Sequence, residues 1–105
     1  MDDDIRAKNI WRTLRTNKGK PLSLAEIMAM SDVGGARITK LFTTDYLSAL
    51  HAARYIRRKG QKPRVFWLVN DSGPRAPAFA RVPELFDPNT GINRVTWRKA
   101  PEGWS

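Results

Sequence analysis

Residues 23–42 read SLAEIMAMSDVGGARITKLF and hold the strongest local signals for the fold. Ser23 is followed three residues later by Glu26, the spacing of a capping box, in which each side chain accepts a hydrogen bond from the other residue's backbone N–H. Apolar residues at helical spacing then predict a short helix over residues 23–31. A tight turn with two adjacent glycines follows at residues 32–35. We therefore expect two short helices around a glycine turn.

Helical periodicity continues after this turn to about residue 58. Residues 57–60 are three cations and a glycine, which is typical of a helix C-terminus. Residues 43–45, Thr-Thr-Asp, are good N-cap types but poor residues for a helix interior. One helix over residues 36–58 and two helices both remain open, and we favour a break at residues 43–45.

A further helix is expected before this region, and strands are expected after it. Over residues 4–16 the apolar side chains recur at helical spacing, while Lys and Arg side chains fall on another face. Residues 64–69, RVFWLV, predict a buried strand that enters a turn at residues 70–74. Prolines argue against any long helix or strand over residues 75–87. A second strand is expected at residues 92–98, and the two strands could pair.

Length and composition restrict the classes of function. The chain has 105 residues, no cysteine and one histidine. Such a chain suits a single domain, with a core over about residues 4–75 and a proline-containing loop, strand or tail over residues 76–105. Thiol chemistry, disulfides and multi-histidine metal sites are excluded. We expect no cofactor, no bound metal and no enzymatic activity, because the carboxylates are scattered and His51 has no nucleophile at a recognisable spacing.

The excess of positive charge is concentrated in the middle of the chain. Residues 34–64 carry 8 basic and 1 acidic side chains, a net charge of +7, out of a total of +9. Such an asymmetry is expected of a surface that neutralises phosphates. A solvated basic face that only aids solubility is the alternative. No apolar run is long enough to cross a membrane, so no membrane partner is expected.

Three stretches, residues 23–33, 45–58 and 65–69, resemble winged helix-turn-helix DNA-binding proteins of bacteria and phages. In those proteins a sequence motif of leucine, x, x, leucine, x, x, alanine, glycine, tyrosine and isoleucine precedes the wing. The matching residues here are Leu47, Leu50, Ala53, Tyr55 and Ile56. Arg54 stands at the glycine position. Residues 68–77, LVNDSGPRAP, are also similar to small proteins of Mu-like transposable phages.

This resemblance implies an α+β fold with three to four helices, a small antiparallel β-hairpin called the wing, and an irregular C-terminal segment. It also implies double-stranded DNA as the partner and a role as a small transcriptional regulator or phage accessory factor. Such a protein would act in the cytoplasm of a bacterium or a phage-infected cell, on the nucleoid when bound. The alternative is a winged-helix interaction module whose basic face docks on an acidic protein. A homodimer remains open.

The helix after the glycine turn would then read bases in the major groove. Its reading face is expected opposite an apolar stripe of Ile38, Leu41 and Phe42. Basic side chains before the buried strand and after a wing tip at residues 72–74 would contact phosphates. The candidate DNA-binding residues are Arg37, Thr39, Lys40, Thr43, Thr44, Lys59, Lys62, Arg64 and Arg75.

Overall fold

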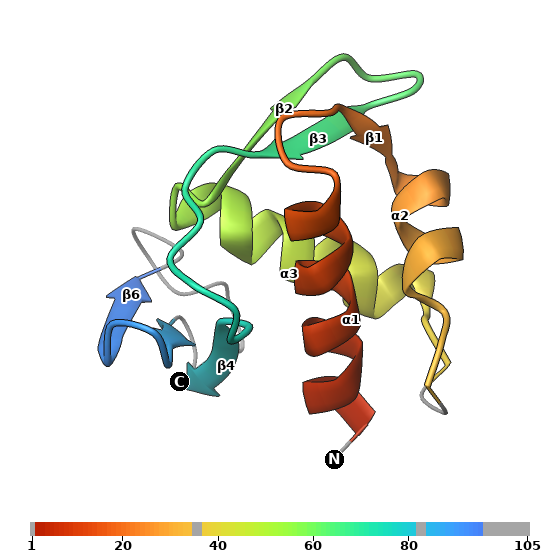
Figure 1. Ribbon diagram of the computed structural model, residues 1–105. Coiled ribbons are helices and arrows are strands. Elements are labelled where there is room, and N and C mark those ends of the chain that lie inside the picture. Colours follow the sequence, from red (N-terminus) through yellow and green to blue (C-terminus); the bar gives the residue numbers. More distant parts are fainter. Residues whose placement is uncertain (1, 35–36, 82–83, 96–105) are drawn as a thin grey trace.

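The computed structural model describes residues 2–34, 37–81 and 84–95 and has the expected α+β class. Its helices are α1 (Asp2–Thr16), α2 (Leu24–Ser31) and α3 (Lys40–Ala52). A small antiparallel sheet of β1 (Leu22–Ser23), β2 (Ile56–Lys59) and β3 (Val65–Leu68) lies across one end of the helices (Figure 1). A second antiparallel sheet contains β4 (Ala78–Arg81), β5 (Glu84–Asp87) and β6 (Ile92–Val95).

The first two helices confirm the local sequence patterns. Trp11 and Leu14 are each 1% exposed, because the apolar stripe of α1 faces the core. At the start of α2 the Ser23 N–H donates to Glu26 Oε1 at 3.0 Å, and the Glu26 N–H donates to Ser23 Oγ at 3.2 Å. These two hydrogen bonds satisfy backbone donors that the first turn of a helix leaves free. The predicted capping box and its helix are therefore present.

The expected helix break at residues 43–45 is wrong, because α3 runs without interruption from Lys40 to Ala52. Thr39 is the N-cap residue, and its Oγ1 accepts a hydrogen bond from the Phe42 N–H at 3.2 Å. The Thr43 hydroxyl donates to the Thr39 carbonyl at 2.7 Å and is fully buried. Its polar group is thus satisfied inside the helix, so Thr43 has no need to cap a new one.

The expected end of this helix near residue 58 is also wrong. Arg54 has a φ of +70°, a left-handed conformation that an α-helix cannot contain. The Arg54 N–H donates to the His51 carbonyl and the Tyr55 N–H to the Leu50 carbonyl, which is the bonding pattern of a Schellman motif. Ile56 then begins β2. The cations at residues 57–59 therefore lie on a strand.

The apolar stripe expected for the third helix is only partly correct. Tyr46, Leu47 and Leu50 form the core face of α3, each no more than 1% exposed. Ile38 is buried but precedes the helix, and Phe42 packs partly buried against the core. Leu41 is 75% exposed and lies outside the stripe. The helix is therefore rotated relative to the expected orientation, because Tyr46 and Leu47 determine which face is buried.

The strand predicted at residues 64–69 is present as β3, but its expected partner is wrong. β3 lies between β1 and β2 and pairs antiparallel with both. Residues 96–98 of the second predicted strand lie outside the described residues, and its first part, β6, pairs with β5. The wing tip expected at residues 72–74 is also wrong, because the turn that joins β2 to β3 is formed by residues 60–64.

The prolines did not prevent short strands over residues 75–87, where β4 and β5 form and join β6 in the second sheet. Hydrogen bonds from buried side chains of the core hold the second sheet and the segment that leads into it. The Trp11 Nε1–H donates to the Gly73 carbonyl at 2.9 Å, the Tyr46 hydroxyl to the Pro77 carbonyl at 2.6 Å, and the Tyr55 hydroxyl to Asp87 Oδ2 at 2.6 Å. Leu85 of β5 is fully buried in the same core.

Candidate functional site

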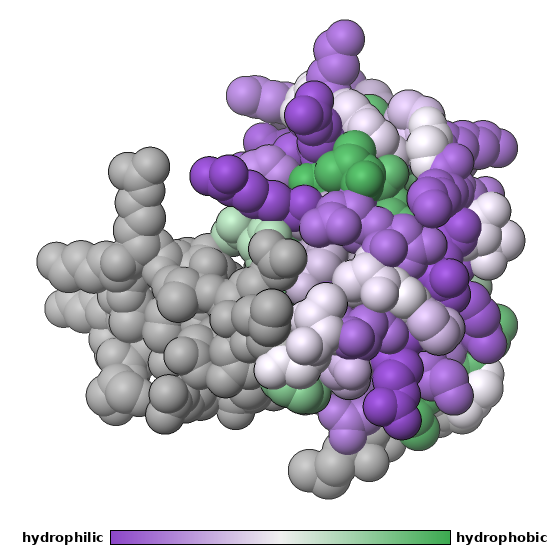
Figure 2. All heavy atoms as spheres, turned by 60° about the vertical axis from the view of Figure 1, so that its left-hand side comes forward, coloured by the Kyte–Doolittle hydropathy of each residue, from purple (hydrophilic) through white to green (hydrophobic). Residues whose placement is uncertain are grey.

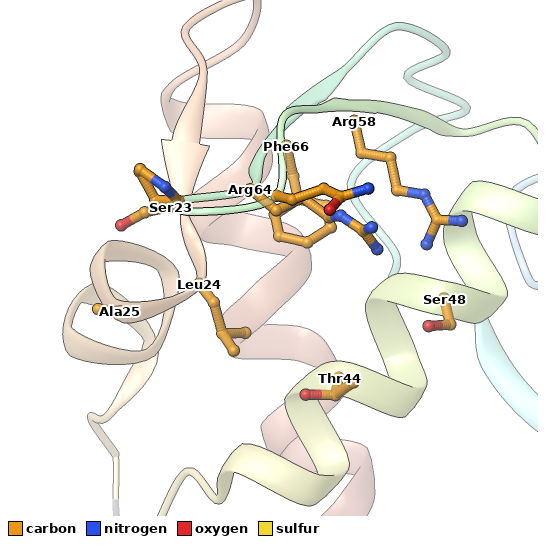
Figure 3. Close-up of a pocket in the computed structure, with 10 residues that line it drawn as sticks. Ser23, Leu24, Ala25, Thr44, Ser48, Arg58, Arg64 and Phe66 are labelled. Carbon is orange, nitrogen blue, oxygen red and sulfur yellow. The ribbon is translucent and has the colours of Figure 1, made fainter.

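A surface groove of about 430 Å³ lies between α3, the β2–β3 hairpin and the first turn of α2 (Figure 3). α3 and the hairpin contribute polar side chains to its wall, and α2 contributes the apolar Leu24 and Ala25. The lining residues are Ser23, Leu24, Ala25, Thr44, Ser48, Arg58, Gln61, Pro63, Arg64 and Phe66. We call this feature the groove, and residues 56–68 the hairpin.

Two guanidinium groups project from the hairpin into the groove toward α3 (Figure 3). Arg58 pairs with Phe66 in the β2–β3 ladder, so its side chain leaves the sheet on the face that covers the core. Arg64 is oriented by a hydrogen bond from its Nε to the Gly60 carbonyl at 3.2 Å. The hydroxyl groups of Thr44 and Ser48 lie on α3 across from these arginines. The groove therefore presents hydrogen-bond donors from both of its walls.

The hairpin carries an uncompensated positive charge. Its five basic residues are Arg57, Arg58, Lys59, Lys62 and Arg64; all are exposed, and residues 56–68 contain no acidic residue. Arg15 and Lys18 form ion pairs with Asp71, but among the described residues no ion pair involves a cation of the hairpin. The local field therefore favours an anionic partner.

His51 responds to this positive field. The imidazole is half-buried near the end of α3. Burial lowers the pKa of His51, and the positive charges of Arg58 and Arg64 lower it further. An added proton would bring a third positive charge near the two guanidinium groups, so the neutral imidazole is favoured. The sequence assigned no role to His51, and only the structure places it near the groove.

One face of α3 remains uncovered. It consists of Lys40, Leu41, Thr44, Asp45 and Ala52, which are exposed, with Ser48 and His51, which are half-buried. We call these residues the exposed face. Among the residues expected to read bases, Lys40 and Thr44 lie on it. Thr43 is buried on the opposite side, which excludes it from any surface contact.

Two other expected residues lie just before α3. The side chain of Thr39 is exposed, but its hydroxyl caps the helix through the Phe42 N–H. Arg37 is also exposed, and its backbone carbonyl accepts a hydrogen bond from Arg6 Nε at 2.6 Å. This bond ties the segment before α3 to α1 and leaves the Arg37 guanidinium at the surface.

The expected phosphate-contacting residues fall into two groups. Lys59, Lys62 and Arg64 lie together on the hairpin. Arg75 lies elsewhere, in a separate hollow that Asp4 and Lys8 of α1 also line. The structure thus brings three of the four residues together and separates the fourth.

The sequence reasoning missed Arg58 and Ser48 of the groove, and Arg57 of the hairpin. Arg57 and Arg58 were assigned to a helix C-terminus, and Ser48 was not considered. The adjacent Tyr55 and Ile56 are good strand formers, and this preference could have identified the strand that carries the two arginines. Ser48 gave no signal, because only the packing of α3 decides which face stays exposed.

The hairpin end of the molecule is strongly hydrophilic. Figure 2 shows hydrophilic side chains at the top, where the hairpin lies in Figure 1, around a small hydrophobic patch. Val69, which directly follows β3, is 48% exposed. Most of this end therefore presents charged groups to solvent.

No protein-family model, no curated protein and no solved structure matches the chain. Within the described residues, no group of three or more His, Cys, Asp or Glu side chains is placed to hold a metal ion. None of the helices in these residues is both long enough and apolar enough to cross a membrane.

Proposed function

We propose that the chain is a winged-helix protein that binds double-stranded DNA through the exposed face of α3 and through the hairpin as a wing. The order α1, β1, α2, α3, β2 and β3, with β3 central in the sheet, supports this interpretation. So does Gly34, which lies in a turn between α2 and α3 with a φ of +76°, since a turn between two helices is how a helix-turn-helix presents its second helix. Gly35, the second glycine of the predicted turn, lies outside the described residues. In such a complex, the N-terminal part of α3 enters the major groove.

The observation that carries the proposal is the uncompensated charge of the hairpin. Arg58 and Arg64 face the polar side chains of α3 across the groove (Figure 3). A DNA backbone offers regularly spaced phosphates, and cations that neutralise them release counterions and so gain affinity. The hairpin contacts would position the protein, while Lys40 and Thr44 reach base edges.

The salt dependence of binding tests this proposal. If six to eight cations contact phosphates, the slope of log affinity against log salt is about −5 to −7 for duplex DNA. We would titrate a fluorescently labelled random-sequence duplex with the protein and follow anisotropy at several salt concentrations. A slope near −2 would count against the proposed interface.

A matched pair of double variants locates the contacts. Arg58→Gln/Arg64→Gln removes two charges from the groove, and Lys8→Gln/Arg75→Gln removes two exposed charges beside α1. The first variant should weaken binding and reduce the magnitude of the slope by about 2, since each lost phosphate contact removes about 0.9. The second should bind almost as the wild type does. Equal losses of DNA affinity in both variants would show that binding depends only on the net charge of the protein.

Competition with an acidic protein distinguishes DNA binding from the alternative function, in which the basic face docks on an acidic protein. If the basic face recognises an acidic protein surface, a polyglutamate-rich protein should displace the duplex at concentrations similar to those of unlabelled DNA. DNA binding that survives this competitor supports the duplex as the partner. Absence of duplex binding at low salt would overturn the proposal.

A further inference from the structure

Leu41 is the most exposed of the large apolar side chains in the part of the chain that the structure describes. It is 75% exposed, compared with 48% for Val69 and 45% for Met30. Single apolar residues on a surface are ordinary. The informative feature is therefore its position, the second residue of α3, where a helix that enters a DNA groove makes its first contacts.

Polar and basic groups surround Leu41. Lys40 precedes it, Thr44 follows one turn later on the same exposed face, and the exposed Arg37 lies just before the helix. A second copy of this chain would present the same cations and would be repelled by them. Asp45, one turn beyond Leu41, is the one carboxylate of the exposed face as defined above. The surroundings thus fit an apolar group that is embedded in a polyanionic, hydrogen-bonding surface.

We propose that Leu41 contacts the C5-methyl group of a thymine in the major groove and so selects a T·A pair in the binding site. This inference rests on the proposed DNA binding. The thymine methyl is the apolar group on a major-groove base edge, and apolar side chains contact it directly. Lys40 and Thr44 meet the neighbouring donors and acceptors, so Leu41 makes the one contact of this face that needs no hydrogen bond.

Replacing thymine with uracil in the DNA tests the contact, because the two bases differ only by the C5-methyl group. A duplex would first be selected from a random pool with the wild-type protein, and each thymine would then be replaced singly. Loss of one buried methyl is expected to weaken wild-type binding about fourfold at one position and to have little effect elsewhere. The uracil scan uses the unaltered protein, so its result does not depend on the folding of a variant.

Leu41→Ala and Met30→Ala form the matched pair of variants. Leu41→Ala should bind the thymine and uracil duplexes equally, whereas Met30→Ala should keep the fourfold preference, because Met30 lies on α2. If uracil has no effect at any position, or if Leu41→Ala keeps the preference, the assignment of Leu41 is overturned while DNA binding stands. If no sequence is enriched and no duplex binds with a steep salt dependence, the proposed function itself fails.

Discussion

Arg54 occupies a backbone position that favours glycine. Its φ is +70°, and a side chain there brings Cβ close to a carbonyl oxygen. The position is C′ of a Schellman motif, and the flanking residues Tyr55 (C″) and Leu50 (C3) are both fully buried in the core. The same arrangement ends α3 and turns the chain into the hairpin. The core packing of these two residues holds the left-handed conformation in place.

Arg54→Gly should therefore stabilise the protein. Relief of the left-handed conformation outweighs the extra entropy of glycine in the unfolded chain, and we expect the free energy of unfolding to rise by about 1 kcal/mol. Urea denaturation followed by circular dichroism measures the change. Ala52→Gly, at an exposed helical position two residues earlier, should instead lower the free energy of unfolding by about 1 kcal/mol. Similar losses in both variants would show that Arg54 is not strained.

The hairpin is the element on which the proposed function depends most. Its turn is tight at Gly60, which has a φ of +80° and lies where an added Cβ would come within 2.8 Å of the Pro63 carbonyl oxygen. That backbone atom cannot move without reshaping the turn. Lys62 and Arg64 flank the same Pro63, so their positions follow the backbone of this turn.

Gly60→Ala should disturb the hairpin beyond a simple backbone penalty. Gly19 provides the matched control, since it has the same φ of +80° and nothing within 4 Å of an added Cβ. We expect Gly19→Ala to cost about 1 kcal/mol of stability, and Gly60→Ala to cost about 1–3 kcal/mol. If DNA binding uses the hairpin, only Gly60→Ala should also weaken the anisotropy titration. Unchanged affinity in a folded Gly60→Ala protein would argue against the hairpin contacts.

At the scale of the whole molecule, Tyr55 and Asp87 fasten the second sheet to the helical core. The Tyr55 hydroxyl donates to Asp87 Oδ2 at 2.6 Å, and the Asn89 N–H donates to Asp87 Oδ1 at 2.9 Å. Burial raises the pKa of Asp87, but hydrogen bonds from Ser72, Tyr55 and Asn89 outweigh this effect and lower it below its usual value of 3.8. The ionised carboxylate is thus the form that the fold favours.

This arrangement predicts acid sensitivity. A depressed folded-state pKa contributes stability above the unfolded pKa of 3.8, and this contribution is lost as pH falls through the folded value. Asp87→Asn should cost about 1–3 kcal/mol at neutral pH, because buried donors lose a charged acceptor. The difference between wild type and Asp87→Asn should shrink below about pH 4. Urea titrations from pH 7 to pH 2 test this, with the exposed Asp45→Asn as a control expected to stay within about 0.5 kcal/mol of wild type.

The sequence by itself determined the features whose contacts are close in the chain. The capping box needs only Ser23 and Glu26, three residues apart, so its signal is complete in the sequence. The apolar period of α1 and the strand at residues 64–69 are equally local. The α+β class and the concentration of positive charge in the middle of the chain were visible in the same way.

The tertiary structure alone decided the features that depend on distant partners. Thr43 lies in the helix interior because burial of Tyr46 and Leu47 stabilises a continuous helix. This stabilisation exceeds the destabilisation caused by the low helix propensity of Thr43. β3 also pairs with β1, which lies far from it in the sequence, and local strand propensity cannot specify such a pairing. The groove has the same origin. Its arginines stand across from α3 only because Arg54 turns the chain back, and the exposure of Leu41 follows from which face of that helix the core buries.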